Sequence, residues 1–217
     1  NTFHYWLWKN NLKKIFDKKW VGFCHYRRFW LKDKNNLNFG NLKDSIIQDV
    51  PKIWDNYEVV LGNEFFVNKT KLSKILKHGK KQLIKNPFVF FSEKKMSVKV
   101  HFDMYHGFGN LDKAIDLLDS DNKNDFREFV NKNGSFNPFN MFICNSYSLL
   151  NDYYKSLFSW LEKCETVFGF NLNSPYGLIR IYAFLAERYL SYWFKKNSNY
   201  ILWPIKHYDI SNYKENL

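Results

Sequence analysis

The sequence contains few cysteines and no long apolar run. Its three cysteines, Cys24, Cys144 and Cys164, lie far apart in 217 residues, without a CxxC or Cys/His ligand spacing. This argues against a zinc-binding fold or a disulfide scaffold, and we expect buried free thiols in a reducing compartment. No run of about eighteen apolar residues is present, which argues against a membrane-spanning helix. The chain begins at Asn1 without Met or a signal sequence, so we expect an N-terminal piece to be missing.

The composition is rich in aromatic and basic residues. Hydrophobic residues make up 45% and aromatic residues 20%, enough for one compact domain over residues 1–217. Flat aromatic rings beyond the needs of a core suit carbohydrate and nucleoside pockets. Lys and Arg outnumber Asp and Glu by 33 to 21, which favours an anionic partner. Residues with A/T-rich codons are abundant throughout, however, so bulk charge carries less weight than local clusters.

The stretch Trp20–Trp30 holds the most distinctive polar cluster. Val21 to Cys24 is short and apolar, as in a buried strand of an α/β sheet. It is followed by His25, Tyr26, Arg27 and Arg28. The carboxyl end of such a strand is where open α/β sheets bind ligands, and two guanidinium groups there suit a phosphate or diphosphate. The alternative is a pair of solvated charges just past a core strand.

Helical and strand patterns alternate along the chain. This favours an α/β fold with a mostly parallel sheet flanked by helices. The expected helices cover residues 2–16, 41–49, 69–85, 110–118, 149–168 and 176–194, and the expected strands cover residues 21–24, 54–61, 139–144 and 201–204. The basic helix 69–85 is a candidate for contact with an anionic membrane surface, with an ordinary solvated face as the alternative. The loop 31–40 is a candidate lid.

The last long helix carries charges on an otherwise apolar surface. Arg180 and Glu187 are seven residues apart, about two turns, so they share a face, and Arg188 lies beside it. Charges on a buried helix are paired or functional. Two interpretations stay open: a structural ion pair, or a carboxylate oriented for proton abstraction.

Three further segments contain candidate polar residues. His101, Asp103 and His106 fall in one short segment, but no further strong ligand is nearby, so we expect a hydrogen-bonded loop rather than a metal site. Asn140 is the polar residue in the first part of the expected strand 139–144, where an amide recognises hydroxyls or closes a turn. Glu64 falls at another strand end.

Four sequence blocks, in order, resemble a bacterial domain family of formerly unknown function. That family occurs in capsular and surface polysaccharide loci and is regarded as glycosyltransferases with a GT-A-like fold. The blocks are Tyr5–Asn10, Gly22–Phe29, Asn140–Ile143 followed by Tyr154, Leu157 and Phe158, and Arg180 with Ala183–Arg188. The resemblance covers essentially the whole chain. The chain departs from the family in lacking its first strand and nucleotide-proximal loop, and in having Thr2-Phe3-His4 where an acidic residue is usual.

The resemblance implies transfer of a sugar from a nucleotide-sugar donor to a growing surface glycan, such as capsule or O-antigen (lipopolysaccharide), on a glycan or lipid-linked acceptor. No Asp-x-Asp follows an expected strand, so we predict no metal site and no firm cofactor. Cationic side chains would instead neutralise the leaving diphosphate. The expected donor or substrate contacts are His25, Tyr26, Arg27, Arg28, Asn140, Arg180 and Arg188. Glu187 is the first choice for the base that activates the acceptor hydroxyl, and Asp103 is the second.

The alternative function is a basic, aromatic-rich module that binds nucleic acid or glycan without catalysis. It predicts aromatic residues interleaved with Lys on exposed strands and a steep salt dependence. Most aromatic residues here fall on apolar helix faces instead, so we expect an enzyme without a nucleic-acid partner. We place it in the cytoplasm, with peripheral contact at the inner face of the cell membrane.

Overall fold

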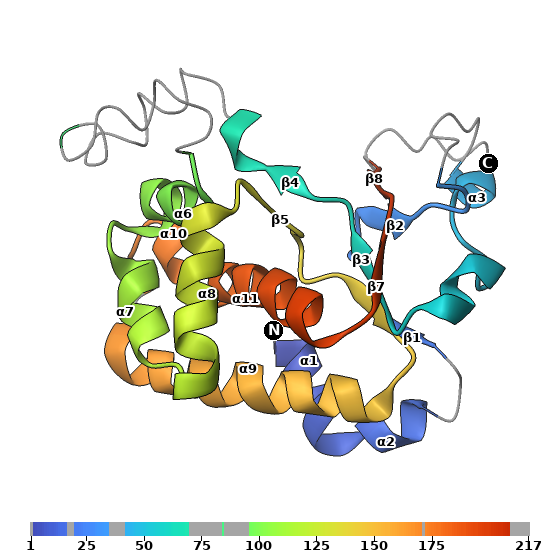
Figure 1. Cartoon of the computed structure of the whole chain (residues 1–217), viewed down its shortest axis with the longest axis horizontal. Coiled ribbons are helices and arrows are strands. Elements are labelled where there is room, and N and C mark those ends of the chain that lie inside the picture. The colour runs from blue at the N-terminus through green and yellow to red at the C-terminus, as the bar shows by residue number, and fades with distance from the viewer. Residues whose placement is uncertain are drawn as a thin grey trace.

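The computed structural model describes residues 2–16, 20–34, 42–69, 84, 96–170 and 172–208. A group of helices packs against one face of a small sheet, and a shorter two-stranded sheet lies beyond it (Figure 1). Within the described ranges, no helix is long and apolar enough to cross a membrane.

The central sheet is mixed, with the strand order β1-β6-β3-β7. Its strands are β1 (Val21–Gly22), β3 (Val59–Gly62), β6 (Phe142–Cys144) and β7 (Tyr200–Trp203). Strand β6 is antiparallel to both β1 and β3, while β3 and β7 are parallel. The mostly parallel sheet predicted from sequence is therefore corrected to a mixed α/β arrangement.

The path between β3 and β6 explains this correction. After β3 the chain continues into β4 (Phe65–Phe66), passes through helices, and returns along β5 (Ser135–Phe136), which is antiparallel to β4. Figure 1 shows β4 and β5 side by side as they leave the sheet. The helices between them are thus the loop of one long hairpin, and β6 must enter the sheet opposite to β3.

The expected buried strand 21–24 is a short edge strand. Gly22 is exposed, and a Cβ on it would lie 2.9 Å from Cγ1 of Ile143 on β6, so glycine permits the close approach of the two strands. The chain then turns back at once, since His25 and Arg28 exchange backbone hydrogen bonds of 3.0 and 3.4 Å. Arg28 begins β2 (Arg28–Trp30), which pairs antiparallel with β8 (Ile205–His207).

Most of the expected helices in the described residues are present, whereas residues 98–106 and 120–132 form helices that the sequence patterns did not predict. They are α1 (Thr2–Asn10), α2 (Leu12–Ile15), α3 (Leu42–Ser45), α6 (Val98–His106), α7 (Asn110–Asp116), α8 (Ser120–Lys132), α9 (Tyr147–Phe168), α10 (Tyr176–Ile179) and α11 (Ile181–Asn197), with 3-10 turns η1 (Lys52–Asn56) and η2 (Val67–Lys69). The predicted helices 2–16 and 176–194 are confirmed with breaks at Asn11 and Arg180. The segment 101–106, expected as a loop, is helical. Residues 35–41 and 70–83 lie outside the described residues, and they include most of the expected lid loop 31–40 and of the expected basic helix 69–85.

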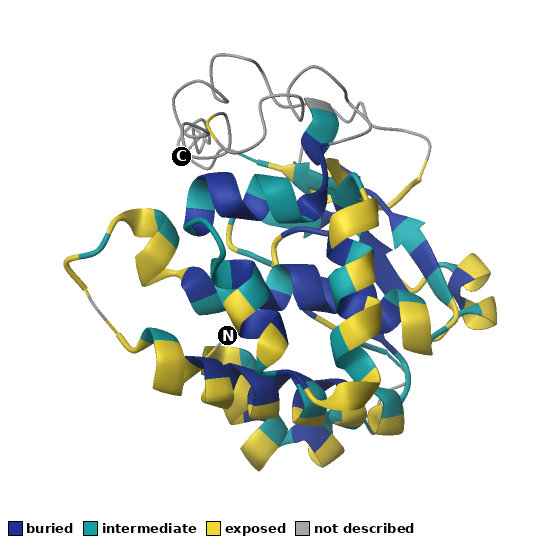
Figure 2. Ribbon diagram, turned by 60° about the vertical axis from the view of Figure 1, so that its left-hand side comes forward, coloured by how far each residue is buried: buried dark blue, intermediate teal, exposed yellow. Residues whose placement is uncertain are grey.

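Helix α11 forms the centre of the core. It contacts α6, α8, α9 and β5, and Figure 2 shows it buried over most of its length while the surrounding helices expose their outer faces. Its residues Leu185, Ala186, Tyr189 and Leu190 are fully buried. On the other face of the sheet, Trp30, Trp54 and Trp203 form a second cluster. Trp30 Nε1 donates to the Phe23 carbonyl at 2.9 Å, which holds the His25–Arg28 turn against the sheet.

Candidate active site

Three segments carry the polar groups of the candidate site. They are the turn His25–Arg28, the residues Phe139–Asn140 that lead into β6, and the first two turns of α11 with Arg180 before them. Glu187 on α11 lies at the centre of their contacts.

Glu187 is held by hydrogen bonds to both of its carboxylate oxygens. Oε1 accepts from the backbone N–H of Phe139 at 3.1 Å, and Oε2 accepts from Nη1 of Arg188 at 3.1 Å. Its side chain is only 15% exposed. Burial raises the pKa of Glu187 above its ordinary value. The charge of Arg188, the Phe139 N–H, and the charges of Arg180 and Arg28 act in the opposite direction. A fixed carboxylate with a raised pKa is suited to accept a proton.

Phe139 and Asn140 have an unusual backbone conformation. Their φ angles are 79° and 53°, in the left-handed region that side chains other than glycine seldom adopt. This conformation places the Phe139 N–H on Glu187, and Asn140 Nδ2 donates to the Ala183 carbonyl at 3.2 Å. Strain of this kind concentrates at functional sites. The two residues thus tie the start of β6 to α11 twice.

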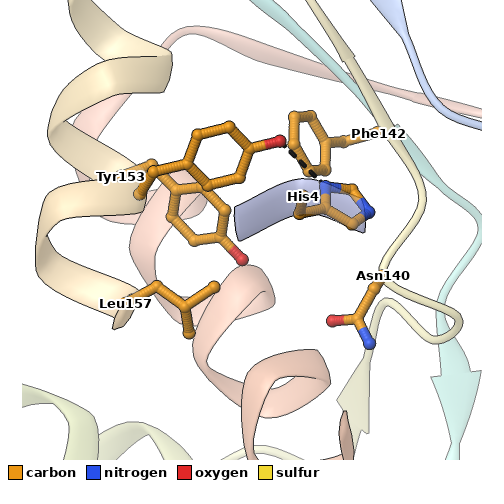
Figure 3. Close-up of a pocket in the computed structure, with 6 residues that line it drawn as sticks. His4, Asn140, Phe142, Tyr153 and Leu157 are labelled. Atoms are coloured by element: carbon orange, nitrogen blue, oxygen red, sulfur yellow. Dashed lines mark hydrogen bonds between the residues drawn. The ribbon is translucent and has the colours of Figure 1, made fainter. Parts of the chain in front are cut away.

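Asn140 also lines a narrow gap with His4, Phe142, Tyr153, Tyr154 and Leu157. Figure 3 shows the Asn140 amide on the opposite side from Tyr153 and Leu157, with His4 next to Phe142. The Oδ1 of Asn140 is buried without a hydrogen-bond partner, while His4 Nδ1 and the Tyr154 hydroxyl are 2.8 Å apart. Burial lowers the pKa of His4 to about 4, so this histidine is neutral near pH 7.

The charges of two arginines from different segments, Arg28 and Arg180, act on Glu187. The guanidinium carbon of Arg28 lies 3.8 Å from the ring centre of Phe139, and Nη1 of Arg180 donates to the Tyr176 hydroxyl. Burial lowers the pKa of His25, and the charges of Arg28 and Arg180 lower it further. The two arginines, His25 and Glu187 therefore belong to one electrostatic cluster, in which the cations suit an anionic ligand.

Arg27 and Tyr26 lie beside this cluster. Tyr26 is 64% exposed, and the Arg27 guanidinium carbon is 5.0 Å from its ring centre. The Arg27 Nε is buried without a hydrogen-bond partner. The Arg27 carbonyl accepts from the backbone N–H of Tyr208 at 2.9 Å. The arginines that the sequence treats as an equivalent pair therefore differ, because Arg28 packs on Phe139 and its charge acts on Glu187, whereas Arg27 packs against Tyr26.

Arg188 lies behind Glu187 and is 1% exposed. Besides Glu187, it donates from Nη1 to the Phe184 carbonyl at 3.2 Å, and its Nη2 lies 3.3 Å from Nδ1 of His101. The Phe136 ring centre is 4.1 Å from its guanidinium carbon. This burial leaves no surface for a donor, so the direct donor contact expected for Arg188 is corrected to a supporting contact through Glu187.

Asp103 belongs to a different network. Its carboxylate pairs with Lys99 at 2.6 Å and accepts from the Gly109 N–H at 3.1 Å, and Lys99 also pairs with Asp112 at 2.9 Å. These contacts join α6 to the start of α7, and the structure does not bring Asp103 to Glu187. In the described part of the chain, no group of three or more His, Cys, Asp or Glu side chains could hold a metal ion. Glu64 pairs with Lys195.

Sequence reasoning missed three contributors to the site. The Phe139 N–H holds the Glu187 carboxylate, and the Tyr176 hydroxyl holds Arg180. His101 contacts Arg188. A backbone donor leaves no signal in a sequence. The one usable signal is Asn140 after Pro138 and Phe139, because asparagine is a common left-handed turn residue.

Comparisons with known proteins give a fold and a family. The chain is similar to an apo structure of the bifunctional glycosyltransferase WbbM, with a TM-score of 0.61 and 14% identity over 96% of this chain and 36% of that chain. The chain thus spans about a third of that protein's length, and the likeness shows the fold. Comparison with curated proteins finds no match. Residues 2–198 match the domain of unknown function DUF4422, and the chain therefore belongs to the DUF4422 family.

Proposed function

We propose that the protein is a glycosyltransferase with a GT-A-like fold, and that Glu187 is its base. The likeness to a glycosyltransferase structure and the DUF4422 match support the class. The single observation that carries the proposal is the held carboxylate of Glu187, which accepts from the Phe139 N–H at 3.1 Å while Arg28 and Arg180 act on its pKa. In sugar transfer from a nucleotide sugar, a base can activate the acceptor hydroxyl and cations can stabilise the leaving nucleoside diphosphate.

In this proposal the diphosphate of the donor lies against Arg28 and Arg180. His25, Tyr26 and Arg27 complete the donor side, and the half-buried Asn140 contacts a sugar. Glu187 takes the proton of the acceptor hydroxyl while the oxygen of that hydroxyl forms a bond to the anomeric carbon of the donor sugar. The bond from that carbon to the diphosphate oxygen breaks, and its electrons stay on the leaving nucleoside diphosphate. Arg28 and Arg180 stabilise this charge.

Donor binding also strengthens the base. The positive charges of Arg28 and Arg180 hold the pKa of Glu187 below the value that burial alone would give. A bound diphosphate neutralises these charges, so the pKa of Glu187 rises when the donor is in place. A higher pKa makes the carboxylate a better proton acceptor at the moment of transfer.

The acceptor in this proposal is a growing surface glycan of the capsule or O-antigen type, free or lipid-linked, handled on the cytoplasmic side of the membrane. We propose no metal ion for the donor site, because the arginines supply the positive charge. Nucleic-acid binding without catalysis is the rival function, and it predicts oligonucleotide affinity that falls steeply with salt.

The test is release of nucleoside diphosphate from a panel of UDP-, GDP- and dTDP-sugars, with glycan acceptors, by wild type, Glu187→Gln and Arg28→Ala. We expect Glu187→Gln to bind nucleoside diphosphate normally and to lose about 10² to 10⁴ in transfer rate. Arg28→Ala should weaken nucleoside diphosphate binding by about tenfold or more. The matched control is Arg127→Ala, which removes an arginine paired with Asp116 on the α7–α8 surface. Full activity of either site variant, or an absolute manganese requirement, would overturn the proposal.

A further inference from the structure

Three of the segments that carry the candidate site and its neighbours each present an exposed aromatic residue beside an arginine. Tyr26, Phe139 and Tyr176 are 64%, 36% and 64% exposed. Each ring lies beside a different arginine: the guanidinium carbons of Arg27, Arg28 and Arg180 are 5.0, 3.8 and 5.3 Å from the respective ring centres. The arginine covers part of each ring, and the remainder meets solvent.

The fold gives little reason for a phenylalanine at position 139. Its φ of 79° is unfavourable for a bulky side chain, and glycine or asparagine would adopt it at lower cost. Exposure of the ring also forfeits much of the free energy that burial of a phenylalanine yields. The contact with Glu187 uses only the backbone N–H, which any residue except proline supplies. A bulky residue that keeps an unfavourable backbone angle and a partly exposed ring is explained by a ligand.

The position of Phe139 indicates which ligand. Because its own N–H holds Glu187, the molecule whose hydroxyl reaches that carboxylate must lie next to the Phe139 ring. The charged part of a donor is attracted to the guanidinium groups, whereas an uncharged sugar ring has an apolar C–H face that suits an aromatic surface.

We infer that the Phe139 ring is the platform on which an uncharged pyranose unit of the acceptor glycan lies with its hydroxyl toward Glu187. This inference rests on the proposed glycosyltransferase function and assigns its acceptor side. It makes the ring of Phe139 a binding element and leaves the backbone of the same residue to hold the base.

The experiment removes the ring and keeps the backbone. Phe139→Asn retains the N–H to Glu187 and tolerates a positive φ, and Phe139→Tyr retains the ring. The matched control is Tyr147→Ala, which removes a 42% exposed aromatic at the start of α9, past the far end of β6 from Asn140. Binding of methyl glycosides of glucose, galactose, mannose and N-acetylglucosamine is measured by saturation-transfer NMR, and binding of UDP, GDP and dTDP by calorimetry on the same samples.

We expect at least one glycoside to receive saturation on its ring C–H protons from wild type, Phe139→Tyr and Tyr147→Ala. Phe139→Asn should bind it about fivefold more weakly, with a smaller change in nucleoside diphosphate affinity, because the ring also stacks on Arg28. Equal glycoside binding by Phe139→Asn and wild type, or no glycoside binding by a protein that binds a nucleoside diphosphate, would overturn the inference alone. Absence of all nucleoside diphosphate binding would instead contradict the proposed function.

Discussion

Nη2 of Arg188 lies 3.3 Å from Nδ1 of His101, directly behind the candidate base. An arginine guanidinium only donates, so His101 must accept at Nδ1 and carry its proton on Nε2. His101 also faces His106 on its own helix, Phe65 of β4 and Phe136 of β5. Burial, the charge of Arg188 and His106 hold the pKa of His101 well below its ordinary value of 6.5. The neutral ring is therefore part of the support of Glu187.

The first prediction concerns the pH dependence of stability. His101, His106 and His4 all have folded pKa values below 6.5, about 3 for His106 and about 4 for His4. Because the unfolded chain takes up protons first, the stabilisation is complete above pH 6.5 and is lost as pH falls toward the folded values. Urea unfolding between pH 7.5 and 5 should show a falling midpoint. Below pH 6.5 the free energy of unfolding should approach a slope of about 1.4 kcal/mol per pH unit for each histidine.

Two variants separate His101 from the other histidines. His101→Gln keeps an acceptor for Arg188 but does not titrate, so its stability should fall less steeply with pH than that of wild type. His101→Leu leaves the Arg188 Nη2 without that acceptor and should lose about 1–3 kcal/mol at every pH. A wild-type midpoint that stays constant from pH 7.5 to 5 would contradict this account.

The second prediction concerns Gly177, which brings α10 against α6. A Cβ at Gly177 would lie 2.1 Å from the Tyr105 carbonyl oxygen and 3.2 Å from Nδ1 of His106. Gly177→Ala must therefore push α10 away, and α10 carries Tyr176, the partner of Arg180. We expect a loss of about 1–3 kcal/mol and weaker nucleoside diphosphate binding. The control is Gly134→Ala, whose Cβ would meet its nearest atom, the Met96 carbonyl oxygen, at 3.7 Å; equal effects of the two changes would argue against a steric cause.

The sequence reveals helices here better than sheet direction. Apolar periodicity predicts 149–168 as a helix, and α9 covers Tyr147–Phe168, because a long amphipathic pattern has few alternative structures. The direction of β6 depends instead on the β4–β5 ribbon, which has only two residues in each strand and no distinctive pattern. A sequence that alternates helices and strands therefore suggests a parallel sheet although the chain returns along an antiparallel ribbon.

Some features of the candidate site follow from the sequence and others depend on tertiary packing. The helical spacing of Arg180 and Glu187 predicts a shared face, and the charge of Arg180 does act on Glu187. The meeting of Arg28 with Phe139 across separate segments depends on tertiary packing and on a positive φ, which sequence patterns do not encode. Asp103 is the converse case: a carboxylate near histidines in sequence pairs with Lys99 and joins two helices.

The third prediction concerns the strained turn at Asn140. Asn140→Ala loses the bond to the Ala183 carbonyl and places alanine at a φ of 53°, so two costs of about 1 kcal/mol each should add. Asn140→Gly loses the same bond but adopts a positive φ freely, so its loss should be about 1 kcal/mol. Urea unfolding of the two variants beside wild type measures both values. If Asn140→Gly is the less stable variant, the left-handed conformation is not the source of the cost.

The last prediction tests the alternative base. Asp103→Asn keeps an acceptor for the Gly109 N–H but removes the negative charge paired with Lys99 at 2.6 Å. Burial raises the pKa of Asp103 while Lys99 opposes that rise, so the carboxylate is a buried half of an ion pair. We expect a loss of about 1–2 kcal/mol in unfolding free energy and a transfer rate per folded molecule within about twofold of wild type. A fall of about a hundredfold or more in that rate, with Glu187→Gln still active, would assign proton abstraction to Asp103 instead.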